Sequence, residues 1–160
     1  MKSISPEKRK QLFSNLLKKG SPKQYLLFFQ QFHEADIADN LEELPIEDRL
    51  KFFTKVDPEL SAEILEEMDL TQQTEIISKF KTTLAAKFIE EMEPDDAVDL
   101  LEELQESNEN KAEEIINALP EKEQEDIRSL LNYEEDSAGA IMTSSYLELP
   151  ENLTVQEALN

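Results

Sequence analysis

Large apolar residues recur every twelve positions through the middle of this chain. This row, which we call the anchor row, consists of Leu44, Val56, Met68, Phe80, Met92 and Leu104. A second row stands three residues earlier and consists of Leu41, Phe53, Leu65, Ile77, Ile89 and Leu101. Apolar residues three apart lie on one face of a helix, whereas a strand alternates every second residue. After a three-residue insertion the register resumes at Leu119 and Leu131, so the repeat predicts a series of short helices.

Proline and capping residues recur in phase with these rows. The prolines that follow the apolar anchors are Pro45, Pro58, Pro94 and Pro120. Proline suits the first turn of a helix, and Asp57 and Asp69 stand where N-terminal caps are expected. Each unit then holds a helix of about eight or nine residues, which is too short to be stable alone. We therefore predict an all-α fold in which about ten short helices form antiparallel hairpins that stack into a right- or left-handed superhelix.

The repeats stop after Leu131, and the sequence changes character. Residues 146–149 are typical of a short strand. Thr154 and Glu157 form a capping box that begins a further helix. The expected divisions are a helical-repeat domain at 1–131, a linker at 132–144 and the start of a second domain at 145–160.

The charge of the chain is strongly negative but unevenly spread. There are 37 acidic and 16 basic residues, giving a net charge of −21, yet residues 1–33 carry seven Lys or Arg and one Glu. That basic stretch is predicted to form helices over 5–19 and 22–33. An acidic body repels phosphates, so we expect no nucleic-acid partner. No apolar run approaches the length that spans a bilayer, so we expect this piece not to cross the membrane.

The sequence offers little that supports catalysis. Its single histidine, His33, lies beside the repeats, and there is no cysteine and no glycine-rich phosphate loop. Paired carboxylates are abundant, but a general acid needs a pocket that raises its pKa, and short solenoid helices rarely supply one. We therefore expect a binding or regulatory protein and not an enzyme.

Acidic residues four apart form columns on two of the predicted helices. The columns are Glu59, Glu63 and Glu67 on one helix and Asp95, Asp99 and Glu103 on another. They are 36 residues apart, which is three repeats, so they occupy the same phase. Like charges at this spacing repel, and a divalent cation relieves that repulsion. Oxygen ligands suit a hard ion such as Mg²⁺ or Ca²⁺. An ordinary solvated face is the alternative, since the helix dipole also favours acids such as Asp95 and Asp96 in a first turn.

Residues 133–143 read Tyr-Glu-Glu-Asp-Ser-Ala-Gly-Ala-Ile-Met-Thr. This segment closely resembles the junction of MgtE-type magnesium transporters, which links an N-terminal superhelical domain to a pair of CBS domains. The repeats, with Leu-Glu-Glu-Leu-Pro and Pro-Asp-Asp-Ala-Val-Asp, resemble that family's N domain. Residues 145–160 resemble the first strand and helix of its first CBS domain, here truncated.

The resemblance implies a function and a site. Members of the family are homodimeric Mg²⁺ channels, and their N and CBS domains lie on the cytosolic side of the membrane. These domains sense Mg²⁺ and close the pore when bridging ions join the acidic N domain to acids of the CBS and pore-proximal helices. The matching ligand positions are Glu63, Asp95, Asp99 and the backbone carbonyl of Ala140. Residues of second rank are Glu59, Asp96 and Gly139.

The resemblance also places the partner acids beyond residue 160, in the CBS and transmembrane domains of the full-length protein. The alternative function is a helical solenoid that binds another protein, as in a motor-switch or adaptor protein, without dependence on a metal. The two hypotheses differ in whether Mg²⁺ changes the conformation.

Overall fold

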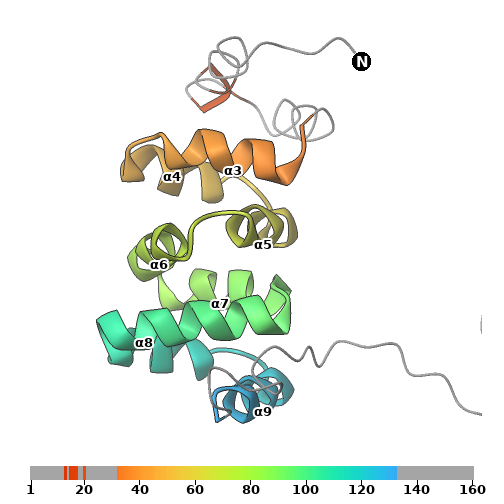
Figure 1. The fold of residues 1–160 in the computed structure, drawn as a ribbon, viewed down its shortest axis with the longest axis vertical. Helices are drawn as coiled ribbons and strands as arrows, with labels where there is room; N and C mark the ends of the chain where they lie inside the picture. Colours follow the sequence, from red (N-terminus) through yellow and green to blue (C-terminus); the bar gives the residue numbers. More distant parts are fainter. Residues whose placement is uncertain (1–12, 14, 18–19, 21–31, 133–160) are drawn as a thin grey trace, which may run out of the picture.

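The computed structural model describes residues 13, 15–17, 20 and 32–132. Within these residues the chain is helical with short turns and contains no strand, which confirms the predicted all-α class for this part. Figure 1 shows the helices stacked in layers along one long axis. The helices are α3 (Glu34–Glu42), α4 (Ile46–Phe53), α5 (Pro58–Glu66), α6 (Leu70–Lys79), α7 (Thr82–Glu91), α8 (Pro94–Ile116) and α9 (Glu121–Leu130).

The helices pack mainly against the helix two places further along the chain. Thus α3 contacts α5, α5 contacts α7, α4 contacts α6 and α6 contacts α8 (Figure 1). Towards the end of the array, α7 also packs on α8 and α8 on α9. This arrangement follows from the sequence, because each short helix carries one apolar stripe that only its neighbours in the stack can cover.

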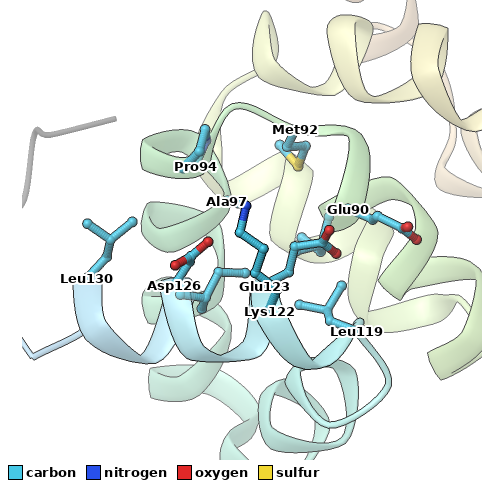
Figure 2. A pocket seen from close by; sticks show the side chains of 11 residues that line it. Glu90, Met92, Pro94, Ala97, Leu119, Lys122, Glu123, Asp126 and Leu130 are labelled. Carbon is cyan, nitrogen blue, oxygen red and sulfur yellow. The ribbon is translucent and has the colours of Figure 1, made fainter. Parts of the chain in front are cut away.

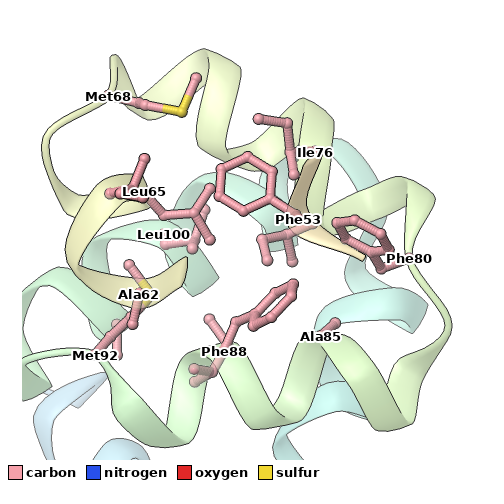
Figure 3. Close-up of a cluster of buried hydrophobic side chains, with 14 of the residues drawn as sticks. Phe53, Ala62, Leu65, Met68, Ile76, Phe80, Ala85, Phe88, Met92 and Leu100 are labelled. Carbon is pink, nitrogen blue, oxygen red and sulfur yellow. The ribbon is translucent and has the colours of Figure 1, made fainter. Parts of the chain in front are cut away.

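The two apolar rows form the core. Every member of the row that precedes the anchors is at most 2% exposed: Leu41, Phe53, Leu65, Ile77, Ile89 and Leu101. The anchor row is less uniform, since Met68, Phe80, Met92 and Leu104 are buried whereas Leu44 and Val56 are only partly covered. Figure 3 shows three phenylalanine rings of this core near one another. The ring centroid of Phe88 lies 6.2 Å from that of Phe53 and 5.5 Å from that of Phe80.

The helix starts agree only in part with the expected caps. Asp57 caps α5, since its Oδ1 accepts a hydrogen bond from the backbone N–H of Leu60 at 3.2 Å. Asp69 is the N-cap residue of α6, but its side chain makes no capping bond; its own N–H instead donates to Oε1 of Glu42 at 2.8 Å. Among the prolines, Pro58 and Pro94 open their helices as expected, whereas Pro45 and Pro120 are themselves N-cap residues.

The expected count of about ten helices is not supported. Residues 32–132 contain seven helices, and the helical residues 13 and 15–17 belong to one more. The units that begin near residues 94 and 109 run together as the 23-residue helix α8, and the other expected helices lie outside the described residues. The extra residues of the insertion extend the first unit, and a kink with extended backbone at Asn108 separates it from the second. The Asn108 side chain accepts a hydrogen bond from the N–H of Lys111 at 3.2 Å, so it caps the second half from within.

The predicted ends of the chain lie mostly outside the described residues. Of the helix expected at 5–19, residues 13 and 15–17 are described and helical, and the Phe13 ring lies 5.5 Å from that of Phe52. The linker beyond residue 132, and the strand and helix expected within 145–160, are outside the described part. None of the described helices is both long and apolar enough to cross a membrane.

Candidate functional site

The acids of α5 lie on the outer face of that helix. Its inner face carries the buried residues Ser61, Ala62, Ile64 and Leu65, so positions 59, 63 and 67 of the predicted column are left exposed. A shallow hollow of about 280 Å³ beside this helix is lined by Glu34, Glu63, Glu66 and Glu67. Every described residue that lines it is a glutamate, so the hollow is strongly negative.

The environment of Glu63 opposes its ionisation. Partial burial and the nearby carboxylates of Glu34, Glu59 and Asp57 raise the pKa of Glu63 above the ordinary value. The predicted pairing of Glu59 with Glu63 on one face is therefore present, and Glu34 of α3 joins it from the neighbouring helix. Glu34 was not predicted, because the sequence does not say which acid of another helix faces this column.

The first two turns of α8 hold the second group of acids. Asp95 and Asp96 are half-buried and Asp99 is exposed. Burial, followed by repulsion from Asp95, Asp99 and Glu93, raises the pKa of Asp96. Burial and the charge of Asp95 likewise raise the pKa of Asp99. These aspartates therefore lie close enough to repel one another, as their spacing predicts.

Glu66 connects the two groups and was missed in the sequence. Its Oε1 accepts a hydrogen bond from the backbone N–H of Glu93, the N-cap residue of α8, at 2.7 Å. Burial raises the pKa of Glu66, and Asp96, Glu93 and Glu63 raise it further, while the hydrogen bond from Glu93 lowers it. The sequence does contain a pattern that marks this position, because a Glu-Glu pair recurs every 24 residues, at 42–43, 66–67 and 90–91.

The described residues do not form a metal site by themselves. No group of three or more acidic or histidine side chains in the described part is arranged to hold a metal ion. The ion pairs found in that part of the chain involve neither the α5 acids nor Asp95, Asp96 and Asp99. Oxygen ligands that repel one another without a cationic neighbour suit a hard divalent ion such as Mg²⁺, with water and other groups completing its shell. Gly139 and Ala140 lie outside the described residues.

A second hollow of about 340 Å³ lies between α7, the start of α8 and α9 (Figure 2). Seven of the described residues that line it are apolar, and Glu90, Glu123, Asp126 and Lys122 supply charged groups. Oε2 of Glu123 is buried without a hydrogen-bond partner. Burial and the nearby charge of Glu90 raise the pKa of Glu123.

His33 does not take part in either hollow. Its side chain is 73% exposed, and its Nδ1 lies 3.2 Å from a carboxylate oxygen of Glu34. Nothing around it resembles the enclosed environment that a general base needs.

A sequence family and two solved structures are similar to this chain. Residues 32–136 match the sequence family described as the MgtE intracellular N domain. The fold is similar to the crystal structure of the soluble part of a magnesium transporter, with a TM-score of 0.85 and 26% identity over 96% of this chain. It is also similar to the cytosolic domain of the Mg²⁺ channel MgtE in complex with ATP, with a TM-score of 0.81 and 24% identity over 94% of this chain. The chain spans 59% and 60% of the lengths of these two structures. No curated protein matches the sequence.

Proposed function

The chain belongs to the MgtE family, and from that membership we propose that it is the Mg²⁺-sensing regulatory domain of a magnesium channel or transporter, on the cytoplasmic side of the membrane. The resemblance inferred from the sequence is confirmed for the N domain. Both similar structures are parts of magnesium transport proteins, which supports a regulatory function in magnesium transport.

The observation that carries the proposal is the uncompensated repulsion on α5 and α8. The pKa values of Glu63, Asp96 and Asp99 are all raised, first by burial and then by neighbouring carboxylates. No described cation forms an ion pair with these residues. A divalent ion favours their ionised forms, and an acid from another domain can complete its shell.

In the proposed mechanism the acidic face repels the acids of the CBS and pore-proximal helices when Mg²⁺ is scarce. When Mg²⁺ is plentiful, ions bridge the two surfaces through Glu63, Asp95 and Asp99, with the Ala140 carbonyl as a further ligand. The closed state is then selected because it binds more ions. Shifting a population from 1:99 to 99:1 requires about 5.5 kcal/mol of differential binding, which several weak sites can supply together.

The test is small-angle scattering of the complete cytosolic region with and without MgCl₂. We expect Mg²⁺ to compact the wild type and to have little effect on a variant with Asp95→Asn and Asp99→Asn. The matched control is Glu121→Gln with Glu125→Gln, which removes two exposed charges at the same spacing on α9. Compaction that is unchanged in the aspartate variant contradicts the assignment of the site.

The protein-interaction alternative has one supporting observation, the hollow beside α9. Its lining combines apolar side chains with three carboxylates and one lysine, which suits a basic, partly apolar segment of another protein. This alternative predicts no conformational response to Mg²⁺, so the scattering experiment distinguishes the two functions.

A further inference from the structure

Glu66 makes a hydrogen bond between helices that are distant in sequence. Its carboxylate lies at the C-terminal end of α5 and accepts from the N–H of Glu93, 27 residues further along, at 2.7 Å. In a capping box, a glutamate of the same helix bonds the N–H of the N-cap residue. Here the glutamate comes from α5 instead, and the side chain of Glu93 makes no capping bond of its own. The contact therefore joins the end of α5 to the start of α8.

The same contact occurs one hairpin earlier. Oε1 of Glu42, at the end of α3, accepts from the N–H of Asp69 at the start of α6, at 2.8 Å and again across 27 residues. The third position in the row would pair Glu90 with Pro120, the N-cap residue of α9, but proline has no N–H. This hydrogen bond therefore recurs with the repeat wherever the N-cap residue has a backbone N–H to donate.

The hydrogen bond of Glu66 lies close to the proposed Mg²⁺ ligands, whereas that of Glu42 does not. Glu66 lies three residues after Glu63 and lines the same hollow. Glu66 bonds Glu93, which lies two residues before Asp95. The charge of Asp96 also raises the pKa of Glu66, so the two carboxylates are near each other. Neither α3 nor α6 carries a proposed ligand.

We propose that Glu66 is a positioning residue for Mg²⁺ binding, which holds the start of α8 with Asp95 and Asp99 in fixed register with Glu63 on α5. This inference rests on the proposed function, because it assigns Glu66 a task in the same ion-binding face. Glu66 acts through Oε1, which accepts from the N–H of Glu93, and the uncharged acceptor of Glu66→Gln separates this role from ion binding by its other oxygen. Groups that orient metal ligands in this way commonly change metal affinity by about 10- to 100-fold when they are removed.

The experiment is a MgCl₂ titration of the complete cytosolic region at constant ionic strength, followed through the amide resonances of Asp95 and Asp99. Glu66→Ala removes the acceptor, and we expect it to raise the Mg²⁺ midpoint about tenfold. Glu66→Gln keeps a carbonyl acceptor at the same place without the charge, so it should return the midpoint to within about twofold of the wild type. Glu42→Ala removes the equivalent bond away from the ligands and should leave the midpoint unchanged. A second readout, the hydrogen-exchange rate of the Glu93 amide, should increase in Glu66→Ala and not in Glu42→Ala.

The other outcomes overturn the inference. If Glu66→Gln raises the Mg²⁺ midpoint as much as Glu66→Ala does, Mg²⁺ binding needs the charge of Glu66, and its assignment as a positioning residue is wrong. If Glu42→Ala raises the midpoint equally, the effect is a general loss of stability. If the wild type binds Mg²⁺ at Asp95 and Asp99 and Glu66→Ala binds it equally well, the inference fails while the proposed function stands. If the wild type shows no Mg²⁺ response at these residues, the proposed function fails, and the inference fails with it even if exchange at Glu93 changes.

Discussion

Replacing Phe88 by alanine should remove a large share of the stability of the array. Phe88 is fully buried at 0% exposure, and its ring has aromatic neighbours in Phe53 and Phe80. Truncating a buried phenylalanine to alanine costs about 3–5 kcal/mol, and aromatic pairs contribute about 0.5–1.5 kcal/mol beyond area burial. We expect a loss of about 4 kcal/mol, against a total of about 5–15 kcal/mol for a domain.

The assay is urea unfolding followed by far-UV circular dichroism. With a slope of about 1–3 kcal/mol per molar urea, the midpoint for Phe88→Ala should fall by more than about 1 M. Lys87→Ala is the matched control, because Lys87 is the exposed neighbour on the same helix and its replacement should change stability by no more than about 0.5 kcal/mol. A loss below about 1 kcal/mol for Phe88→Ala would refute the view that this ring cluster holds the layers together.

Three further predictions concern charge and capping. Burial, and then the charge of Glu90, raises the pKa of Glu123 in the folded state above its ordinary value of 4.5. Protonation of Glu123 therefore stabilises the fold below pH 4.5, and this stabilisation is lost as the pH rises through the raised pKa. The melting temperature should therefore rise on acidification from pH 7 towards that value, and Glu123→Gln should flatten the trend. The pair of Arg128 with Glu113 is about half exposed, so Glu113→Gln should cost less than about 1 kcal/mol in urea unfolding. Asn108→Ala should cost about 1 kcal/mol by the same measurement, since it removes the cap within α8, and Asn108→Asp should retain most of that stability.

The helical stack could be predicted because its cause is local. The row that begins at Leu41 is buried throughout, since a short helix has one apolar stripe and its position along the chain fixes which residues form that stripe. The kink at Asn108 could not be predicted from the same pattern. An insertion of three residues is compatible with a longer turn or a longer helix, and the choice depends on how α8 packs against α6 and α7.

The candidate site could be predicted only within single helices. The spacing of Asp95 and Asp99 places them on one face, and the structure agrees that they repel each other. The contact of Glu66 with Glu93 joins two helices 27 residues apart, and periodicity does not say which helix end meets which helix start. For the same reason Glu34 appears beside Glu63 only in the folded chain.

An ion-sensing face on α5 and the start of α8 is tested most directly by locating where Mg²⁺ binds within the complete cytosolic region. We would record amide chemical shifts during a MgCl₂ titration, with KCl at matched ionic strength as the reference. We expect Mg²⁺ to shift resonances of α5 and of the first two turns of α8 more than those of α9, although α9 carries Glu121, Glu123 and Glu125 in its first half. Equal shifts across all the acid-rich helices, or equal effects of KCl and MgCl₂, would contradict a specific ion-sensing face.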